Sequence, residues 1–139
     1  MRILVDTNIF VDYVAKRHPF VDDARRIITL CVENSVDGCI AAHTVTNLFY
    51  ILRKQMPVRE RKQFLIDLCR TFTVIGIDYA KLEFCLHNDE FDDFEDCLQD
   101  ECAKEFDADY IITRNIKDFT ESAVEAIEPH EFLKKHGRI

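Results

Sequence analysis

A short acidic segment, residues 91–96, holds the side chains whose types and spacing best suit chemistry. It reads Phe-Asp-Asp-Phe-Glu-Asp and leads into a helical pattern of apolar residues over 94–106. Asp93, Asp96 and Asp100 recur at spacings of three and four residues, which places them together on one face of that predicted helix. Grouped carboxylates repel one another unless a divalent cation, a basic side chain or a helix N-terminus lies among them. The segment predicts either a cation site or a solvated first turn capped by Asp93.

Polar residues also follow two short apolar runs elsewhere in the chain. Asp6 ends the run 2–5, and Asn115 comes shortly after the run 110–113. Wholly apolar runs of this length are typical of strands buried on both faces of a parallel sheet. The carboxyl ends of parallel strands meet at one edge, so we expect Asp6 and Asn115 to approach the acids of 91–96 there. Simple capping of the next helix is an equal alternative for Asp6.

An oxygen-rich site without histidine or cysteine favours Mg²⁺ or Mn²⁺ over zinc. The five histidines show no ligand spacing, and the six cysteines form no C-x-x-C pair, so we expect the cysteines to be buried free thiols. A hard cation in such a site can activate a water, orient it in line with a scissile phosphate and neutralise the leaving oxygen.

The elements that must position these residues alternate along the chain. Apolar runs predict strands at 2–5, 39–42, 73–77, 110–113 and, at an edge, 126–127. Helical patterns cover 9–15, 21–32, 43–52, 58–71, a short stretch after Asp78, 94–106 and 131–136. This alternation predicts an α/β fold, with a parallel sheet of about five strands and helices on both faces. Neither a G-x-G-x-x-G nor a Walker A motif occurs, which excludes dinucleotide and P-loop sites of these types.

Composition limits the class of protein. At 139 residues and 47% hydrophobic, the chain is expected to form a single domain over residues 1–139. A net charge of −8 argues against general binding to a phosphate backbone, so any nucleic-acid contact must be local. This acidity suits a carboxylate-lined metal site or a surface covered by a basic partner. No apolar run is long enough for a signal or a membrane span, so we expect a cytoplasmic protein without membrane contact.

Four segments together resemble the PIN domain family, most closely the VapC-like toxins of toxin–antitoxin pairs. They are Asp6-Thr7-Asn8, the HTVTNLFY stretch at 43–50, the DFED stretch at 93–96 and the DYIITRNIKDF stretch at 109–119. They occur in the family's order, and the resemblance covers essentially the full length. It implies that the α/β fold is a PIN-like three-layer sandwich.

The resemblance also implies a function, a Mg²⁺- or Mn²⁺-dependent ribonuclease that is the toxin of a toxin–antitoxin pair. Asp6 and Asp96 match the family's metal ligands, while Asp93, Asn115 and Asp118 match or adjoin further site positions. The implied partners are an RNA substrate and a cognate antitoxin, which often inserts a basic residue among the acids. Members commonly form homodimers, so a homodimer is expected here by resemblance alone.

One position departs from the family pattern. Asn47 stands where many PIN nucleases have Glu, which removes one negative charge from the site unless Glu95 or Asp118 compensates. Without compensation, the alternative is a degenerate PIN-like module that acts only by binding partners. A third reading, a phosphoacceptor receiver domain, needs a pair of acids after the first strand and a lysine after a late strand. Asp6 has no acidic neighbour and no lysine ends the run 110–113, so we reject this reading.

Overall fold

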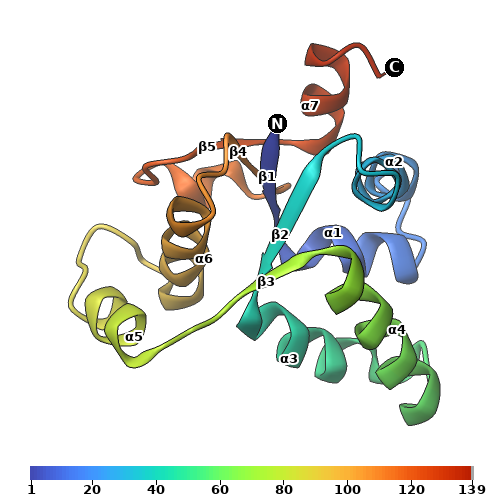
Figure 1. Ribbon diagram of the computed structural model, residues 1–139, viewed down its shortest axis with the longest axis horizontal. Helices are drawn as coiled ribbons and strands as arrows, with labels where there is room; N and C mark the ends of the chain where they lie inside the picture. Colours follow the sequence, from blue (N-terminus) through green and yellow to red (C-terminus); the bar gives the residue numbers. More distant parts are fainter. Residues whose placement is uncertain (139) are drawn as a thin grey trace.

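The computed structural model describes residues 1–138 and shows one twisted parallel sheet flanked by helices (Figure 1). The strands, in sheet order β3-β2-β1-β4-β5, all pair in parallel. Their bounds are β1 (Arg2–Val5), β2 (Asp37–Ala41), β3 (Thr73–Ile75), β4 (Tyr110–Ile112) and β5 (Glu125–Ile127). The predicted sheet is confirmed, and β1 lies at its centre, where its apolar residues Ile3, Leu4 and Val5 are fully buried.

The helices occur in the predicted order. They are α1 (Thr7–Val14), α2 (Val21–Val32), α3 (Ala42–Ile51), α4 (Val58–Thr71), α5 (Tyr79–Leu86), α6 (Phe94–Glu105) and α7 (Pro129–Lys135), with 3₁₀ turns η1 (Leu52–Lys54) and η2 (Ile116–Phe119). Helix α1 begins earlier than the predicted 9–15 because Asp6 is its cap and accepts from the Thr7 N–H at 2.7 Å. Strand β3 ends before the predicted residue 77 because its only partner, β2, ends at Ala41, which pairs with Ile75.

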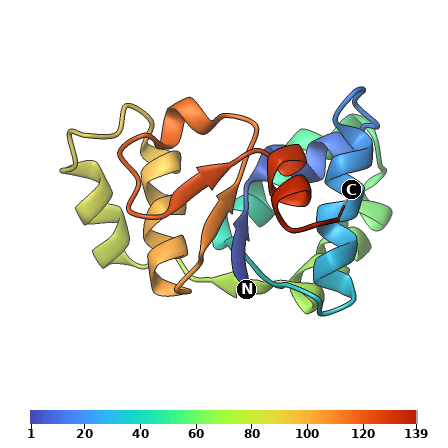
Figure 2. The same ribbon diagram turned by 90° about the horizontal axis from the view of Figure 1, so that it is seen from above.

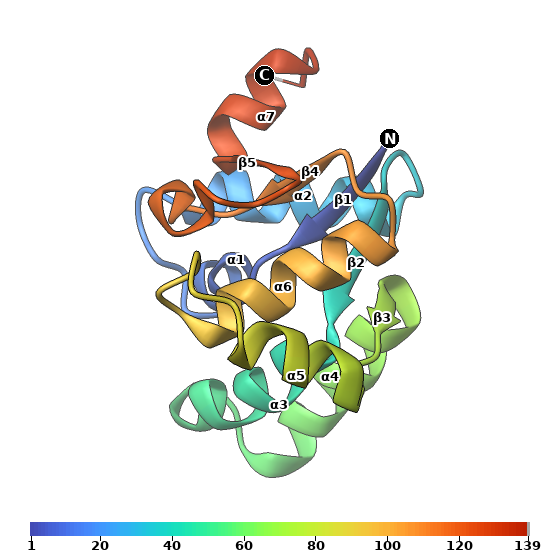
Figure 3. The same ribbon diagram turned by 90° about the vertical axis from the view of Figure 1, so that its left-hand side faces the viewer.

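Alternate strand residues build two apolar layers, one on each face of the sheet. Ile3 and Val5 pack with α1, α2, α3, α4 and α7, whereas Leu4 packs with α6. In Figure 2, α5 and α6 lie on one side of the strands and α1, α2 and α7 on the other. Figure 3 shows α5 in front of α6, where Cys85 joins Cys97 in a small separate cluster. The predicted three-layer α/β sandwich is confirmed.

The cysteine prediction was right for five residues and wrong for one. Cys31, Cys39, Cys85, Cys97 and Cys102 are buried free thiols, but Cys69 is exposed. Helix α4 buries Leu65 and Leu68, and Cys69 follows one position later, about 100° further around the helix. Among residues 1–138, no helix has the length and apolar character needed to cross a membrane.

Candidate active site

The carboxyl ends of β1, β2 and β4 open onto one cleft with a volume of about 350 Å³. Carboxylates and amides dominate its lining: Asp6, Asp93, Glu95, Asp96, Asp118, Asn8, Asn47, Gln99 and Asn115. We call this site the acidic cleft. All five residues predicted for the site lie on it, although they come from three distant parts of the chain. Asp100 does not line it, because it is buried and its carboxylate accepts from the Ser122 hydroxyl.

Asp6 is 6% exposed, and both of its carboxylate oxygens accept hydrogen bonds. Oδ1 accepts from the Thr7 backbone N–H at 2.7 Å and from Gln99 Nε2 at 2.5 Å, while Oδ2 accepts from the Thr113 hydroxyl at 2.7 Å. Burial raises the pKa of Asp6 above its ordinary value, and these hydrogen bonds partly oppose the shift. Asp6 therefore both caps α1 and lines the acidic cleft.

The N-terminus of α6 delivers further acids to the cleft. Asp93 is the predicted cap, since its Oδ1 accepts from the Asp96 backbone N–H at 3.1 Å. Burial raises the pKa of the Asp96 carboxyl to about 7, and repulsion from Asp93, Asp6 and Asp118 adds to the shift. Repulsion from its neighbours thus opposes the ionisation of Asp96, although the side chain of Arg17 also lines this cleft.

Asn47 reaches across the cleft to the acid of a neighbouring helix. Its Nδ2 donates to Glu95 Oε2 at 3.1 Å, which joins α3 to the first turn of α6. The position where the family resemblance leads one to expect Glu therefore holds an amide, and this amide donates to another carboxylate of the same cleft. This contact favours the expectation that Glu95 compensates for the missing charge.

The segment after β4 completes the wall. The Thr113 hydroxyl, which donates to Asp6, also accepts from the Asn115 backbone N–H at 3.0 Å, and η2 then brings Asp118 to the cleft. Thr113 and Gln99 were not predicted as site residues. A threonine at the end of an apolar strand was a usable signal, and so was the position of Gln99, one helical turn after Asp96.

The donor set fits a hard divalent cation. Its groups are oxygens, and the buried Oδ1 of Asn8 and Oε1 of Gln99 lack hydrogen-bond donors within residues 1–138. Mg²⁺ needs one or two carboxylates and keeps several waters, so a compact cage is not required. Among the described residues, no group of three or more His, Cys, Asp or Glu side chains lies close enough together to hold a metal ion. Among the acids that line the cleft, Asp6 and Asp96 have raised pKa values; Asp6 is buried and Asp96 is half-buried.

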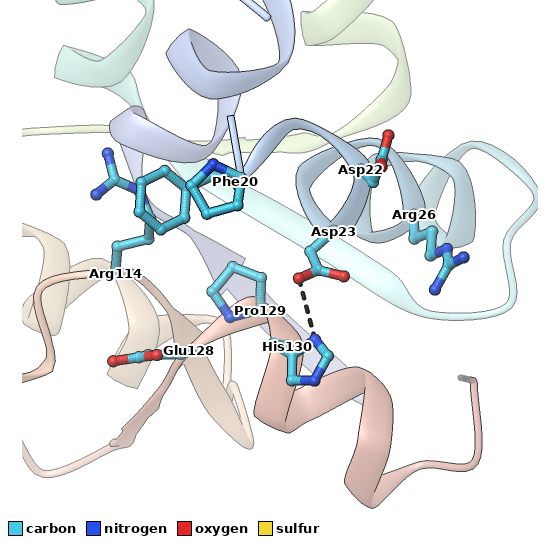
Figure 4. A pocket seen from close by; sticks show the side chains of 9 residues that line it. Phe20, Asp22, Asp23, Arg26, Arg114, Glu128, Pro129 and His130 are labelled. Atoms are coloured by element: carbon cyan, nitrogen blue, oxygen red, sulfur yellow. Dashed lines mark hydrogen bonds and ion pairs between the residues drawn. The ribbon is translucent and has the colours of Figure 1, made fainter. Parts of the chain in front are cut away.

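A second, larger cleft of about 740 Å³ lies between α2 and α7 (Figure 4). Phe20 and Pro129 supply apolar walls, and His130 Nδ1 lies 3.1 Å from Asp23 Oδ2 at the base of α2. We call it the α2–α7 cleft. It contains none of the predicted site residues, and Arg114 on its wall directly precedes Asn115 of the acidic cleft.

The fold and the site define a class: a parallel three-layer α/β protein whose carboxylates converge at the carboxyl edge of the sheet. A family model described as PIN domain matches residues 2–117. The chain belongs to the PIN domain family, as the sequence motifs indicated. A search of curated proteins found no significant match.

Three solved structures illustrate the shared fold. A chain of VapBC2 from Rickettsia felis, bound to a promoter DNA fragment, has a TM-score of 0.66 at 21% identity, covering 92% of this chain and 98% of that one. VapBC-1 from nontypeable Haemophilus influenzae has a TM-score of 0.65 at 16% identity, covering 94% of this chain and 99% of that one. A Klebsiella pneumoniae toxin–antitoxin complex has a TM-score of 0.66 at 22% identity, covering 91% of this chain and 97% of that one. At these identities the likeness establishes the fold.

Proposed function

We propose that this protein is a Mg²⁺- or Mn²⁺-dependent ribonuclease that hydrolyses RNA phosphodiester bonds and serves as the toxin of a toxin–antitoxin pair. The observation that carries the proposal is the convergence of five carboxylates on one cleft, those of Asp6, Asp93, Glu95, Asp96 and Asp118. Their mutual repulsion would be relieved by a divalent cation. Membership of the PIN domain family, whose toxin members are generally nucleases, supports the same conclusion.

Asp6 and Asp96 would hold the cation, which supplies a water of lowered pKa and neutralises charge on the scissile phosphate. The chain keeps Asp6 in place through the donors of Gln99 and Thr113. Asp96, with its pKa raised to about 7, must lose its proton before it can act as a ligand. Its partial protonation in the metal-free protein should therefore make cation binding tighten as pH rises through this range.

Asp93, Asn115 and Asp118 would complete the site. Each lines the acidic cleft, where a carboxylate can accept a proton from the attacking water and an amide can orient the phosphate. Their backbones are held by the α6 cap and by the Thr113 hydroxyl, so the groups are placed before the substrate arrives.

For partners, we propose an RNA substrate, a cognate antitoxin and a homodimeric assembly. The structural relatives from Rickettsia felis and Klebsiella pneumoniae are toxin–antitoxin complexes. The acidic cleft and the net charge of −8 suit a partner that inserts a basic side chain among the carboxylates.

A degenerate PIN module that only binds partners is the second candidate, and Asn47 is the observation that favours it. The two functions are separated first by metal binding. Mn²⁺ at 100 times its Kd would stabilise a folded site by about 2.7 kcal/mol, a rise of several degrees in Tm. We expect this rise in the wild type, its loss in Asp6→Asn, and its retention in Asp67→Asn, which removes an acid on α4 outside the cleft. A wild type without any rise contradicts the proposal, and a rise without RNA cleavage favours the binding module.

A further inference from the structure

Arg114 and Asp12 form a charge pair beside the acidic cleft. Arg114 Nε donates to Asp12 Oδ2 at 2.6 Å and its NH2 donates to Oδ1 at 3.1 Å, a two-pronged contact that holds the carboxylate in one plane. Asp12 is fully buried on α1. Arg17 NH1 lies 3.8 Å from the same carboxylate, but half of its side chain is exposed. Arg114 is thus the main partner of a carboxylate that water does not reach.

The guanidinium of Arg114 is also fixed on its flat face. It lies 4.0 Å from the ring centre of Phe20, a cation–π contact at the wall of the α2–α7 cleft (Figure 4). Asp12 on α1 thus holds the edge of the guanidinium, and Phe20, which precedes α2, covers its face. A lysine at this position could not bond both carboxylate oxygens in one plane while also stacking flat on the aromatic ring.

The position of Arg114 in the chain connects this anchor to the site. Thr113, the preceding residue, donates to Asp6 Oδ2, and Asn115, the next one, lines the acidic cleft. Helix α1, which carries Asp12, begins directly after Asp6. The charge pair therefore fastens together the two segments that meet at the Asp6 carboxylate.

We propose that Arg114 is a positioning residue of the metal centre. Its contacts with Asp12 and Phe20 fix the backbone of residues 113–118, so that Thr113 and Asn115 keep their places against Asp6. Arg114 lines the α2–α7 cleft and not the acidic cleft, so it acts through its neighbours. The inference rests on the proposed function, because it assigns Arg114 to the support of that site.

A purely structural role would also destabilise the protein on mutation, so the test needs a matched control. Arg2 makes contacts of the same kind at the opposite end of β1: its NH1 donates to the Phe106 carbonyl at 2.8 Å, and its guanidinium lies 5.1 Å from the Phe106 ring centre. We compare Arg114→Met, Arg114→Lys and Arg2→Met with the wild type at a temperature where all are folded. Calorimetric titration with Mn²⁺ gives the affinity of the site. Hydrogen exchange at the Asn115 amide, which donates to Thr113, reports the order of the segment without metal.

We expect Arg114→Met and Arg114→Lys to bind Mn²⁺ about 10-fold to 100-fold more weakly than the wild type, the usual effect of losing a group that orients a ligand. Exchange at Asn115 should accelerate in both. Arg2→Met should lose thermal stability and keep its Mn²⁺ affinity and its Asn115 exchange rate. If Arg114→Met does not fold, Arg114→Lys, which keeps the positive charge, decides by the same two measurements.

Wild-type affinity in both Arg114 variants, or equal loss in Arg2→Met, overturns the positioning role. If the wild type itself binds no Mn²⁺, the proposed function fails, and the metal-free exchange measurement then decides alone. Faster exchange at Asn115 in the Arg114 variants supports the role, and unchanged exchange overturns it.

Discussion

Gln99 Nε2 donates to Asp6 Oδ1 at 2.5 Å, joining the second turn of α6 to the carboxyl end of β1. Both side chains are buried, and the Oε1 of the same amide has no donor within the described residues. The amide therefore orients the carboxylate with one end and leaves an acceptor oxygen at the cleft with the other.

This contact predicts that Gln99→Leu weakens the metal site. Loss of the donor removes a hydrogen bond that lowers the pKa of Asp6, so the pKa should rise further. We expect Mn²⁺ affinity to fall about tenfold and stability to fall by about 1.5–3 kcal/mol, measured by calorimetric titration and urea unfolding. Gln63→Leu is the control, because Gln63 donates to Asp67 at 3.0 Å on the surface of α4. Unchanged affinity in Gln99→Leu would contradict the role given to this amide.

The raised pKa of Asp96 predicts how stability depends on pH. With an unfolded value near 3.8 and a folded value of about 7, the folded protein holds a proton that the unfolded chain releases across this window. Stability without metal should therefore fall as pH rises through the window. Asp96→Asn removes the titration, so in EDTA at about pH 8 it should exceed the wild type by on the order of 1 kcal/mol, after allowance for solvent screening.

Near pH 4 the two proteins should be equally stable, because Asp96 is then largely protonated in the folded state. Urea unfolding at both pH values measures the difference. Asp67→Asn serves as the control for the loss of one acidic side chain on the surface of α4. An advantage of Asp96→Asn that is the same at both pH values would show that ionisation of the Asp96 carboxyl is not its cause.

Asn47→Glu tests the compensation assigned to Glu95. The substitution replaces an amide that donates at 3.1 Å with a second carboxylate beside Glu95. Without metal we expect a loss of about 1 kcal/mol, and with Mn²⁺ we expect recovery together with tighter binding of the ion. Asn47→Ala removes the hydrogen bond without adding charge and should show no such recovery. Equal destabilisation of Asn47→Glu with and without Mn²⁺ would place this residue outside the metal centre.

The packing of β2 against α2 and the C-terminal end of α4 predicts a site where even a methyl group is too large. A Cβ on Gly38 would lie 2.7 Å from Cys31 Sγ and 2.8 Å from Phe72 Cε1, both of them buried. Gly38→Ala should cost about 1–3 kcal/mol through overpacking. Gly76→Ala, whose Cβ would have no neighbour within 4 Å, should leave stability nearly unchanged. Urea unfolding gives the stability of both variants. A Gly38→Ala variant as stable as Gly76→Ala would contradict the packing around Gly38.

Most of the fold could be predicted from sequence because the strands are short apolar runs and the helices are periodic. The five residues predicted for the site also line the acidic cleft, since Asp6 and Asn115 follow strands and Asp93 opens a helix, whereas Gln99 and Arg17 on the same cleft were not predicted. One error came from tertiary packing: Cys69 was expected to be buried, but it lies outside the packed face of α4. The hydrogen-bond partners of Gln99, Thr113 and Arg114 could not be predicted in the same way. Gln99, Thr113 and the Arg114 anchor gain their roles only when α1, α6 and β4 meet.

The most direct test of the central claim is cleavage of a mixed RNA pool by the purified protein with Mn²⁺ or with EDTA. Asp6→Asn is the inactive control for contaminating nuclease, and Asp67→Asn is the matched acid outside the cleft. We expect cleavage by the wild type and by Asp67→Asn with Mn²⁺, and none by the wild type in EDTA or by Asp6→Asn. Equal cleavage by Asp6→Asn, or none by folded wild-type protein free of antitoxin, would contradict the assignment of the acidic cleft as a ribonuclease site.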